Sequence, residues 1–460
     1  MTLGRLKFTL LMSMVVGYLV LTYGFMQLRI PPGGIGIPLG ELVLLIYLMT
    51  INWPRTIHDM GRTTYLPVFV LWWAYGTLMV VIGFIQYGPW ALRDGTAMIE
   101  SLYIIVGFAV ASNPRQLDRF FRWLGIAAVL YVVMLWGYFD APNMRELSPT
   151  LTGGQGQEVS LLFYYPFASN FVLWAAMGLL LFFARHPRWG KLALAGAGLL
   201  IAFALVVVQA RLTYLQILAL FALLLLLRRS TLSRATLLVP MMFIGLGAFI
   251  MAGVQVGGRI SDEVDFDFFI NHILSIVGMG EGSEAIEQAN SGVPLRLQWW
   301  ESIWGQLTDS IDNMLFGLGY GIPLVDFGVG EEGVKVREPH NSYLSLLARL
   351  GVTGVILWLA VHLALVAAWW RAWSFARRQG WQEWNDRLMW LMSFFILLWV
   401  AAAPEDGFEK PFFAIPYYVM WGVVLRTLLH FKDWSAAPPV PLADHDDPGR
   451  RDPRVPATAS

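Results

Sequence analysis

The chain has 460 residues, of which 57% are hydrophobic and only 14% charged, and its mean hydropathy is +0.57. A soluble domain carries about 25% charged residues, so this composition excludes an ordinary soluble enzyme, a disordered chain and a collagen. The 32 basic and 32 acidic residues cancel, so net charge gives no indication of a nucleic-acid partner, and the absence of cysteine excludes disulfides, Cys-ligated zinc and thiol catalysis.

Apolar runs long enough to cross a membrane as a helix, about 20 residues, recur along the chain. The first has a short basic lead at Arg5 and Lys7 without a small-residue cleavage site, which indicates a retained span rather than a signal peptide. We predict an all-α polytopic membrane protein with about twelve transmembrane helices. The expected spans are 8–26, 36–52, 66–86, 95–111, 120–139, 159–183, 191–208, 212–227, 235–254, 352–370, 388–403 and 411–429.

The basic residues predict how these spans are oriented. Most of the 32 lie in alternate loops, and the positive-inside rule assigns such loops to the cytoplasm. Both termini are then cytoplasmic. The predicted organisation is nine spans in 1–254, one large periplasmic loop in 255–342, a surface helix and three spans in 343–432, and a disordered cytoplasmic tail in 433–460.

The large periplasmic loop is predominantly acidic and should contain two short helices. An amphipathic helix is expected over 294–312, opened by Pro294, and a second over 341–350. Gly351 and Gly354 predict a break between the second helix and the span 352–370, because the combined length exceeds one perpendicular crossing. The apolar face of the first helix should be formed by Leu295, Trp299, Ile303 and Leu307.

Only two of the seven histidines, His272 and His340, fall in outer loops under this topology. His340 follows Pro339 and precedes a residue suited to cap the next helix, Asn341 or Ser342. Its imidazole at the membrane surface can accept a proton from a hydroxyl. The structural alternative is a histidine that only caps a helix or binds a carbonyl.

Two arginines lie where they could contact a phosphate group. Arg211 sits between two apolar spans with almost no loop, and Arg296 opens the loop helix; a guanidinium suits bidentate phosphate binding. The alternatives are a snorkelling anchor for Arg211 and a solvated helix face for Arg296. The alternating glycines Gly317, Gly319 and Gly321 permit close backbone approach to a ligand, or simply form a turn.

Acidic residues gather in two outer segments. Asp265 and Asp267 have a spacing that could hold a divalent cation, although a solvated acidic loop is the favoured interpretation. Glu405, Asp406 and Glu409 fill the last short outer loop, where they could orient a base or an acceptor, although a role without chemistry is favoured there as well.

Several of these motifs, in this order, resemble the O-antigen ligase and O-antigen polymerase family. The similarity is most specific over about 294–370. It rests on Arg296 and Trp299, then Gly317, Gly319 and Gly321, then His340, Asn341, Tyr343 and Leu344, then Gly351 and Gly354.

This resemblance implies a metal-independent, cofactor-free, inverting glycosyltransferase of the bacterial inner membrane, with its active site facing the periplasm. Its donor would be a glycan on undecaprenyl pyrophosphate. The acceptor would be lipid A–core in a ligase or another lipid-linked glycan in a polymerase; a protein O-glycan ligase and a polysaccharide transporter are the further alternatives. Membrane lipids are the other expected partners, and no nucleic acid.

The resemblance also implies roles for individual residues. The essential histidine of the family corresponds to His340, and its two pyrophosphate-region arginines correspond to Arg211 and Arg296. Five further residues are expected to contribute to substrate binding: Gly319, Lys335, Arg337, Asn341 and Tyr343.

Overall fold

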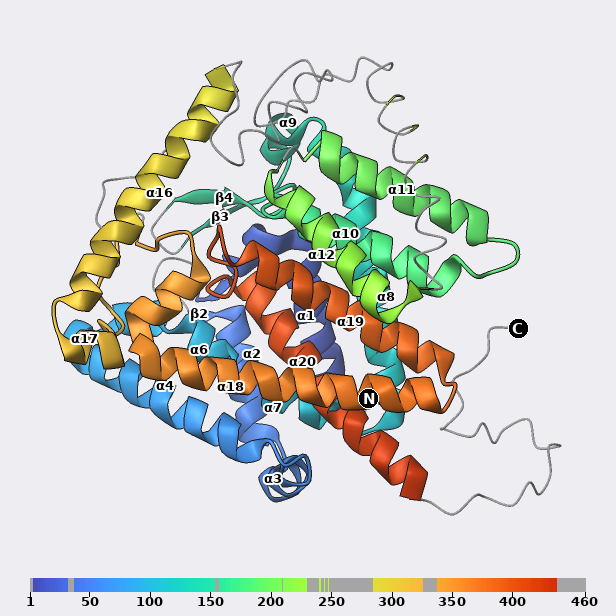
Figure 1. The fold of residues 1–460 in the computed structure, drawn as a ribbon, viewed down its shortest axis with the longest axis horizontal. Coiled ribbons are helices and arrows are strands. Elements are labelled where there is room, and N and C mark those ends of the chain that lie inside the picture. The colour runs from blue at the N-terminus through green and yellow to red at the C-terminus, as the bar shows by residue number, and fades with distance from the viewer. Residues whose placement is uncertain are drawn as a thin grey trace.

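The computed structural model describes residues 3–31, 37–153, 157–208, 210–229, 284–325 and 337–436, together with the isolated positions 240, 244 and 247. Within them the chain folds as a bundle of helices with two small antiparallel hairpins (Figure 1). The strands are β1 (Arg29–Ile30) with β2 (Ile37–Pro38), and β3 (Thr150–Thr152) with β4 (Glu158–Ser160).

The helices vary from one turn to ten turns in length, and several are interrupted. They are α1 (Leu3–Met26), α2 (Leu39–Thr50), α3 (Trp53–Gly61), α4 (Leu66–Tyr87), α5 (Pro89–Asp94), α6 (Thr96–Glu100), α7 (Tyr103–Val110), α8 (Pro114–Met134) with a 3₁₀ turn (Leu135–Tyr138), α9 (Ala141–Glu146), α10 (Ala168–Gly178) with a π turn (Leu179–Phe183), α11 (Gly190–Val206), α12 (Leu212–Leu227), α16 (Glu284–Thr308), α17 (Ile311–Phe316), α18 (Ser342–Arg378), α19 (Gln382–Ala401) and α20 (Pro411–Ala436).

Five helices of the described chain are long and apolar enough to cross a membrane. They are Gly4–Met26, Leu66–Tyr87, Pro114–Tyr138, Ser342–Arg378 and Pro411–Ser435, and shorter apolar helices accompany them. The chain is therefore a helical membrane protein, whereas twelve spans and their orientation stay a prediction. The predicted span 235–254 lies outside the described residues apart from three isolated positions, as do 437–460 of the predicted tail.

Two predicted spans are divided in the structure. The run 95–111 forms α6 and α7, separated by a turn at Ser101, whose hydroxyl donates to the carbonyl of Met98 at 2.6 Å. The run 159–183 starts in β4, and its helix begins only at Ala168. Pro166 explains that late start, because a proline disfavours helical geometry in the residue before it.

Helix α20 forms the centre of the bundle and is buried along its membrane-spanning length. It packs most extensively against α7, and then against α18 and α1. Gly107 and Gly422 allow the close approach to α7, because a Cβ atom at either would lie within 2.2 Å of a carbonyl oxygen of the other helix. The N-terminal end of α20 thereby places the loop 402–410 against the start of α18.

Helix α16 differs from its predicted boundaries. It runs from Glu284 through Pro294, so the prediction that Pro294 opens this helix is wrong. A proline inside a helix costs about 3 kcal/mol because it removes a hydrogen bond, but it need not end the helix. Trp299, Ile303 and Leu307 are buried as predicted, whereas Leu295 is exposed.

The predicted break in α18 is confirmed at Gly351, whose backbone leaves helical geometry with φ 63° and ψ −171°. Only glycine adopts that conformation readily, and a Cβ atom there would lie 2.5 Å from the nitrogen of Gly317. The surface helix 342–350 and the span that follows are thus two helices joined at a kink.

Three carbonyl groups at this break find donors outside the helix. A helix end leaves its last carbonyls without partners inside the helix, and here the glycine-rich turn after α17 supplies two donors and Tyr75 of α4 supplies the third. Ala348 accepts from the nitrogen of Leu318 (2.7 Å), Arg349 from the nitrogen of Gly319 (3.1 Å), and Leu350 from the hydroxyl of Tyr75 (2.8 Å).

Candidate functional site

His340 lies directly before α18, with a left-handed backbone (φ 50°) and its side chain 33% exposed. The cap of α18 is Asn341, whose Oδ1 accepts hydrogen bonds from the nitrogens of Tyr343 (3.1 Å) and Leu344 (3.0 Å). The capping role is therefore filled by Asn341, one of the two neighbours that the sequence offered for it. The imidazole of His340 points elsewhere and is available for other contacts.

Two carboxylates face that imidazole. The Nδ1 atom of His340 lies 3.3 Å from Oε2 of Glu405 and 3.3 Å from Oδ2 of Asp406. The buried indole of Trp299 lies next to the imidazole, with 6.0 Å between the ring centroids. The neighbouring Trp300 donates its indole N–H to the carbonyl of Pro339 at 3.0 Å, which fixes the backbone before the histidine.

Ser342 attaches the carboxylate-bearing loop to the start of α18. Its backbone nitrogen donates to the carbonyls of Ala402 (2.9 Å) and Glu405 (3.2 Å). Its hydroxyl donates to the carboxylate of Glu409 and accepts from the nitrogen of Phe408 at 3.1 Å. These bonds hold residues far apart in the sequence in one place, so the loop presents its acids to His340.

Arg296 reaches the same loop from α16. Its guanidinium donates to the carbonyl of Pro404 at 3.1 Å and to Oε1 of Glu405 at 3.2 Å. One carboxylate, that of Glu405, therefore contacts both Arg296 and His340. We call His340, Arg296, Glu405 and Asp406 the histidine cluster.

Arg211 belongs to the surroundings of this cluster. It precedes α12, and its pKa is lowered by burial and, second, by the positive charge of Arg296. Two guanidinium groups close enough to affect one another repel, and an anion between them relieves that repulsion. The two arginines selected from the sequence are thus brought together.

The carboxylates also change the basicity of the histidine. Burial acts to lower the pKa of His340, but the adjacent carboxylates of Glu405 and Asp406 outweigh it. The pKa is therefore raised above its usual 6.5, and the neutral ring is a stronger base than a free imidazole.

The other residues proposed for substrate binding have mainly structural contacts. Gly319 lies in the turn that completes the end of the surface helix, and the hydroxyl of Tyr343 donates to the carbonyl of Trp399 at 2.8 Å. Arg337 is buried against Asp94 and over the ring of Trp90. Lys335, and the proposed cation site at Asp265 and Asp267, lie outside the described residues, as does His272.

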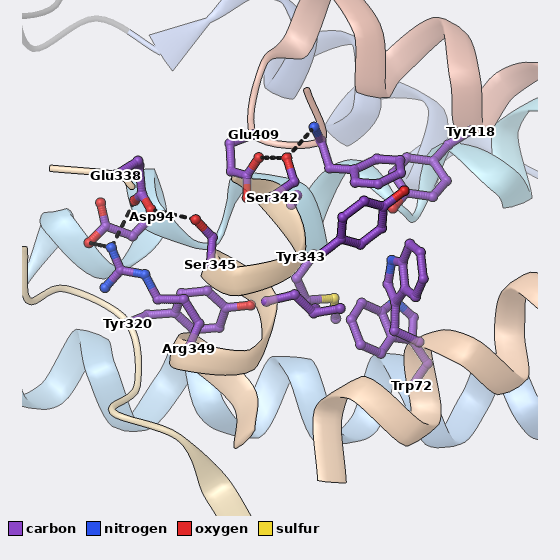
Figure 2. A pocket seen from close by; sticks show the side chains of 15 residues that line it. Trp72, Asp94, Tyr320, Glu338, Ser342, Tyr343, Ser345, Arg349, Glu409 and Tyr418 are labelled. Atoms are coloured by element: carbon purple, nitrogen blue, oxygen red, sulfur yellow. Dashed lines mark hydrogen bonds and ion pairs between the residues drawn. The ribbon is translucent and has the colours of Figure 1, made fainter. Parts of the chain in front are cut away.

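A second group of charges is buried beside the histidine cluster (Figure 2). Oδ2 of Asp94 accepts from Arg337 at 3.0 Å and lies 3.2 Å from Arg349, which also pairs with Glu338 at 2.8 Å. We call Asp94, Arg337, Glu338 and Arg349 the buried ion network. Sequence reasoning missed it, although Arg349 within an apolar helix is the kind of costly charge that signals a partner.

A small cavity adjoins this network. Its volume is about 30 Å³, enough for one or two water molecules. Glu338, Ser345, Arg349 and Glu409 supply polar groups to its lining (Figure 2). Burial raises the pKa of both Glu338 and Glu409. Ser345 and Arg349 belong to the surface helix, so the cavity lies against that helix.

Residues 196–359 match the family model described as O-antigen ligase. The matched stretch contains Arg211, Arg296 and His340, and it ends before the loop that bears Glu405 and Asp406. No curated protein matches the chain.

Proposed function

We propose that this chain, which belongs to the O-antigen ligase family, moves a glycan from undecaprenyl pyrophosphate to an acceptor hydroxyl at the periplasmic face of the inner membrane. The observation that carries the proposal is the shared carboxylate of Glu405. This carboxylate contacts His340, the one described histidine that the predicted topology places in an outer loop. It also contacts Arg296, whose charge acts on Arg211. A proton acceptor and an anion site thus occupy adjacent positions, as glycosyl transfer from a pyrophosphate requires.

His340 acts as the general base in this mechanism. Its Nδ1 lies 3.3 Å from a carboxylate oxygen of Glu405 and 3.3 Å from one of Asp406. These carboxylates favour the tautomer with the proton on Nδ1, so its Nε2 is the atom that accepts the proton of the acceptor hydroxyl. The two carboxylates stabilise the imidazolium that results, as a carboxylate does for the histidine of a hydrolase triad. Glu405 and Asp406 are positioning residues here, because they act through the histidine.

Arg211 and Arg296 bind the pyrophosphate as it leaves. Breaking the bond between the sugar and the pyrophosphate adds negative charge to the leaving oxygen, and preorganised guanidinium groups stabilise that charge. Attack by the acceptor oxygen on the anomeric carbon displaces the pyrophosphate directly and inverts the configuration. The two cations supply the electrostatic stabilisation without a metal ion, so chelating agents should leave activity unchanged.

The direct test uses purified protein with a synthetic polyprenyl-pyrophosphate glycan. We expect transfer to lipid A–core for a ligase, whereas extension of a second lipid-linked glycan would identify a polymerase with the same chemistry. The His340→Ala protein should bind the donor but not transfer it. Substantial turnover by His340→Gln, which hydrogen-bonds but cannot accept the proton as imidazole does, would contradict the general-base role.

The proposed orientation in the membrane can be tested by cysteine labelling. The chain has no native cysteine, so only the introduced residue can react. Single cysteines at Ser261 and Ser291 should react with an impermeant thiol reagent from the periplasm, and one at Ser233 should not. Labelling at Ser233 in intact spheroplasts would place the proposed site on the wrong side of the membrane.

A further inference from the structure

A second cavity lies at the other end of the bundle from the histidine cluster. It has a volume of about 210 Å³ and is enclosed by α1, α2, α3, α7 and α20, with the start of α8. One lining residue, Arg426, is roughly 20 Å along α20 from the loop that holds Glu405, at 1.5 Å per residue. The cavity is therefore separate from the proposed active site.

The lining of this cavity has an excess of positive charge. Lys7, Arg55 and Arg426 contribute three cations, and Asp59 is the single carboxylate among the lining residues. Asp59 pairs with Arg426 and lies 4.0 Å from Arg55, so it neutralises only part of that charge. A cavity with two uncompensated cations favours an anionic occupant.

The two cations contributed by Lys7 and Arg55 keep donors for an anion. The Nζ of Lys7 donates to the carbonyl of Thr50 at 3.0 Å, which satisfies only one of its three protons. The guanidinium of Arg55 lies 4.0 Å from Asp59, too far for a hydrogen bond. Charge-assisted hydrogen bonds from such groups are the strong contacts of a phosphate site.

The rim of the cavity adjoins an apolar surface. The short helix α3 turns Thr56 and Asp59 inward and leaves Trp53 and Ile57 exposed on its outer side. Such a helix, with an aromatic residue at its apolar edge, is typical of the boundary between lipid headgroups and acyl chains. A ligand held here would have lipid beside it.

We propose that this cavity binds a phosphate group, supplied by the headgroup of an anionic membrane phospholipid. Its phosphate oxygens would accept from Lys7 and Arg55, and its acyl chains would follow the exposed side of α3. The cavity is smaller than the roughly 300–1,000 Å³ of sites for drug-sized molecules, which fits a headgroup. This inference is independent of the proposed transferase function.

Native mass spectrometry of the full-length protein in detergent tests the proposal, with phosphatidylglycerol as the probe. We expect bound phosphatidylglycerol in the wild type and at least a tenfold loss of affinity in the double variant Lys7→Gln and Arg55→Gln. Arg55→Gln alone, which removes one of the two cations, should lose about threefold. Arg62→Gln is the matched control, because Arg62 lies at the same end of the bundle but pairs with Asp433 outside this cavity.

Titration with inorganic phosphate distinguishes the two sources of the group. Competition by millimolar phosphate, lost in the same variants, would support the site but assign it to free phosphate. Thermal unfolding without added lipid establishes that each variant is folded; if the double variant is not, Arg55→Gln alone decides. Equal lipid and phosphate binding by wild type and by the folded variants would overturn the proposal.

Discussion

The histidine cluster and the buried ion network both adjoin the surface helix and use the same kinds of residue in opposite ways. In the network, two arginines and two acids neutralise one another at 2.8–3.2 Å, and Arg349 is only 4% exposed. In the cluster, the side chains of His340, Arg296 and Glu405 are each about one-third exposed. A further cation, Arg211, lies nearby.

This difference indicates that the charges of the buried ion network stabilise the fold, whereas those of the histidine cluster can bind a substrate. Paired, buried ions leave no capacity for a ligand, and removing one partner strands the other. Exposed ions with a second arginine at hand retain hydrogen-bonding capacity. We therefore expect changes in the network to affect folding, and changes in the cluster to affect turnover.

The largest effect is expected at the histidine. His340→Ala should reduce transfer by roughly 10²–10⁴-fold, the usual contribution of a general base. Its thermal unfolding and donor binding should match the wild type, since Asn341 and not His340 caps the helix. Assays of transfer beside unfolding curves measure both; a destabilised His340→Ala protein would remove the distinction between the two regions.

Arg349→Ala should instead destabilise the protein. It leaves Glu338 without its buried partner and Asp94 with Arg337 alone, and stranding a buried charge costs about 3–5 kcal/mol. Activity should fall only in proportion to the fraction unfolded, measured by thermal unfolding in detergent. Arg378→Ala, at the far end of the same helix, is the control. Normal stability with lost turnover would assign Arg349 to the reaction.

Smaller losses are expected at the arginines near the cluster. Arg211→Ala and Arg296→Ala should each reduce transfer at least about tenfold, because a charge-assisted hydrogen bond is worth about 1.5–3 kcal/mol. Lysine should restore activity only in part, since it lacks the planar fork. Donor titrations with each variant measure this, and near-normal kinetics in both alanine variants would exclude them from the pyrophosphate site.

The pH profile gives the smallest and most specific effect. Only the neutral imidazole accepts a proton, so transfer should fall as pH drops through the pKa of His340, which lies above 6.5. Glu405→Gln removes one raising influence and should move the midpoint of kcat to lower pH, whereas Glu301→Gln on the exposed side of α16 should not. An unmoved midpoint would separate Glu405 from the base.

The helical segments show which parts of the secondary structure could be predicted from the sequence pattern alone. The helix bounds 212–227 and the break at Gly351 agree with the structure, because the length of an apolar run and the position of a glycine are local properties. The start of α16 and the strand at Glu158–Ser160 do not, because a proline inside a helix and a short hairpin depend on what packs around them.

The candidate site divides in the same way. His340, Arg211 and Arg296 stand out in the sequence because charges and a histidine at outer loops of an apolar chain are few and costly. Their roles relative to one another were not readable there, since Glu405 follows His340 by 65 positions and meets it only through the bonds of Ser342.

The sequence by itself thus determined that the chain enters a membrane, where its helix breaks, and which few charged groups are available for chemistry. Tertiary structure alone decided which of those charges form buried pairs and which stay partly exposed. Arg337, predicted to bind substrate, instead packs against Asp94 and Trp90, whereas Glu405 joins Arg296 to His340. The physical reason is that burial and pairing depend on contacts between distant segments, and these set both the energy and the availability of a charge.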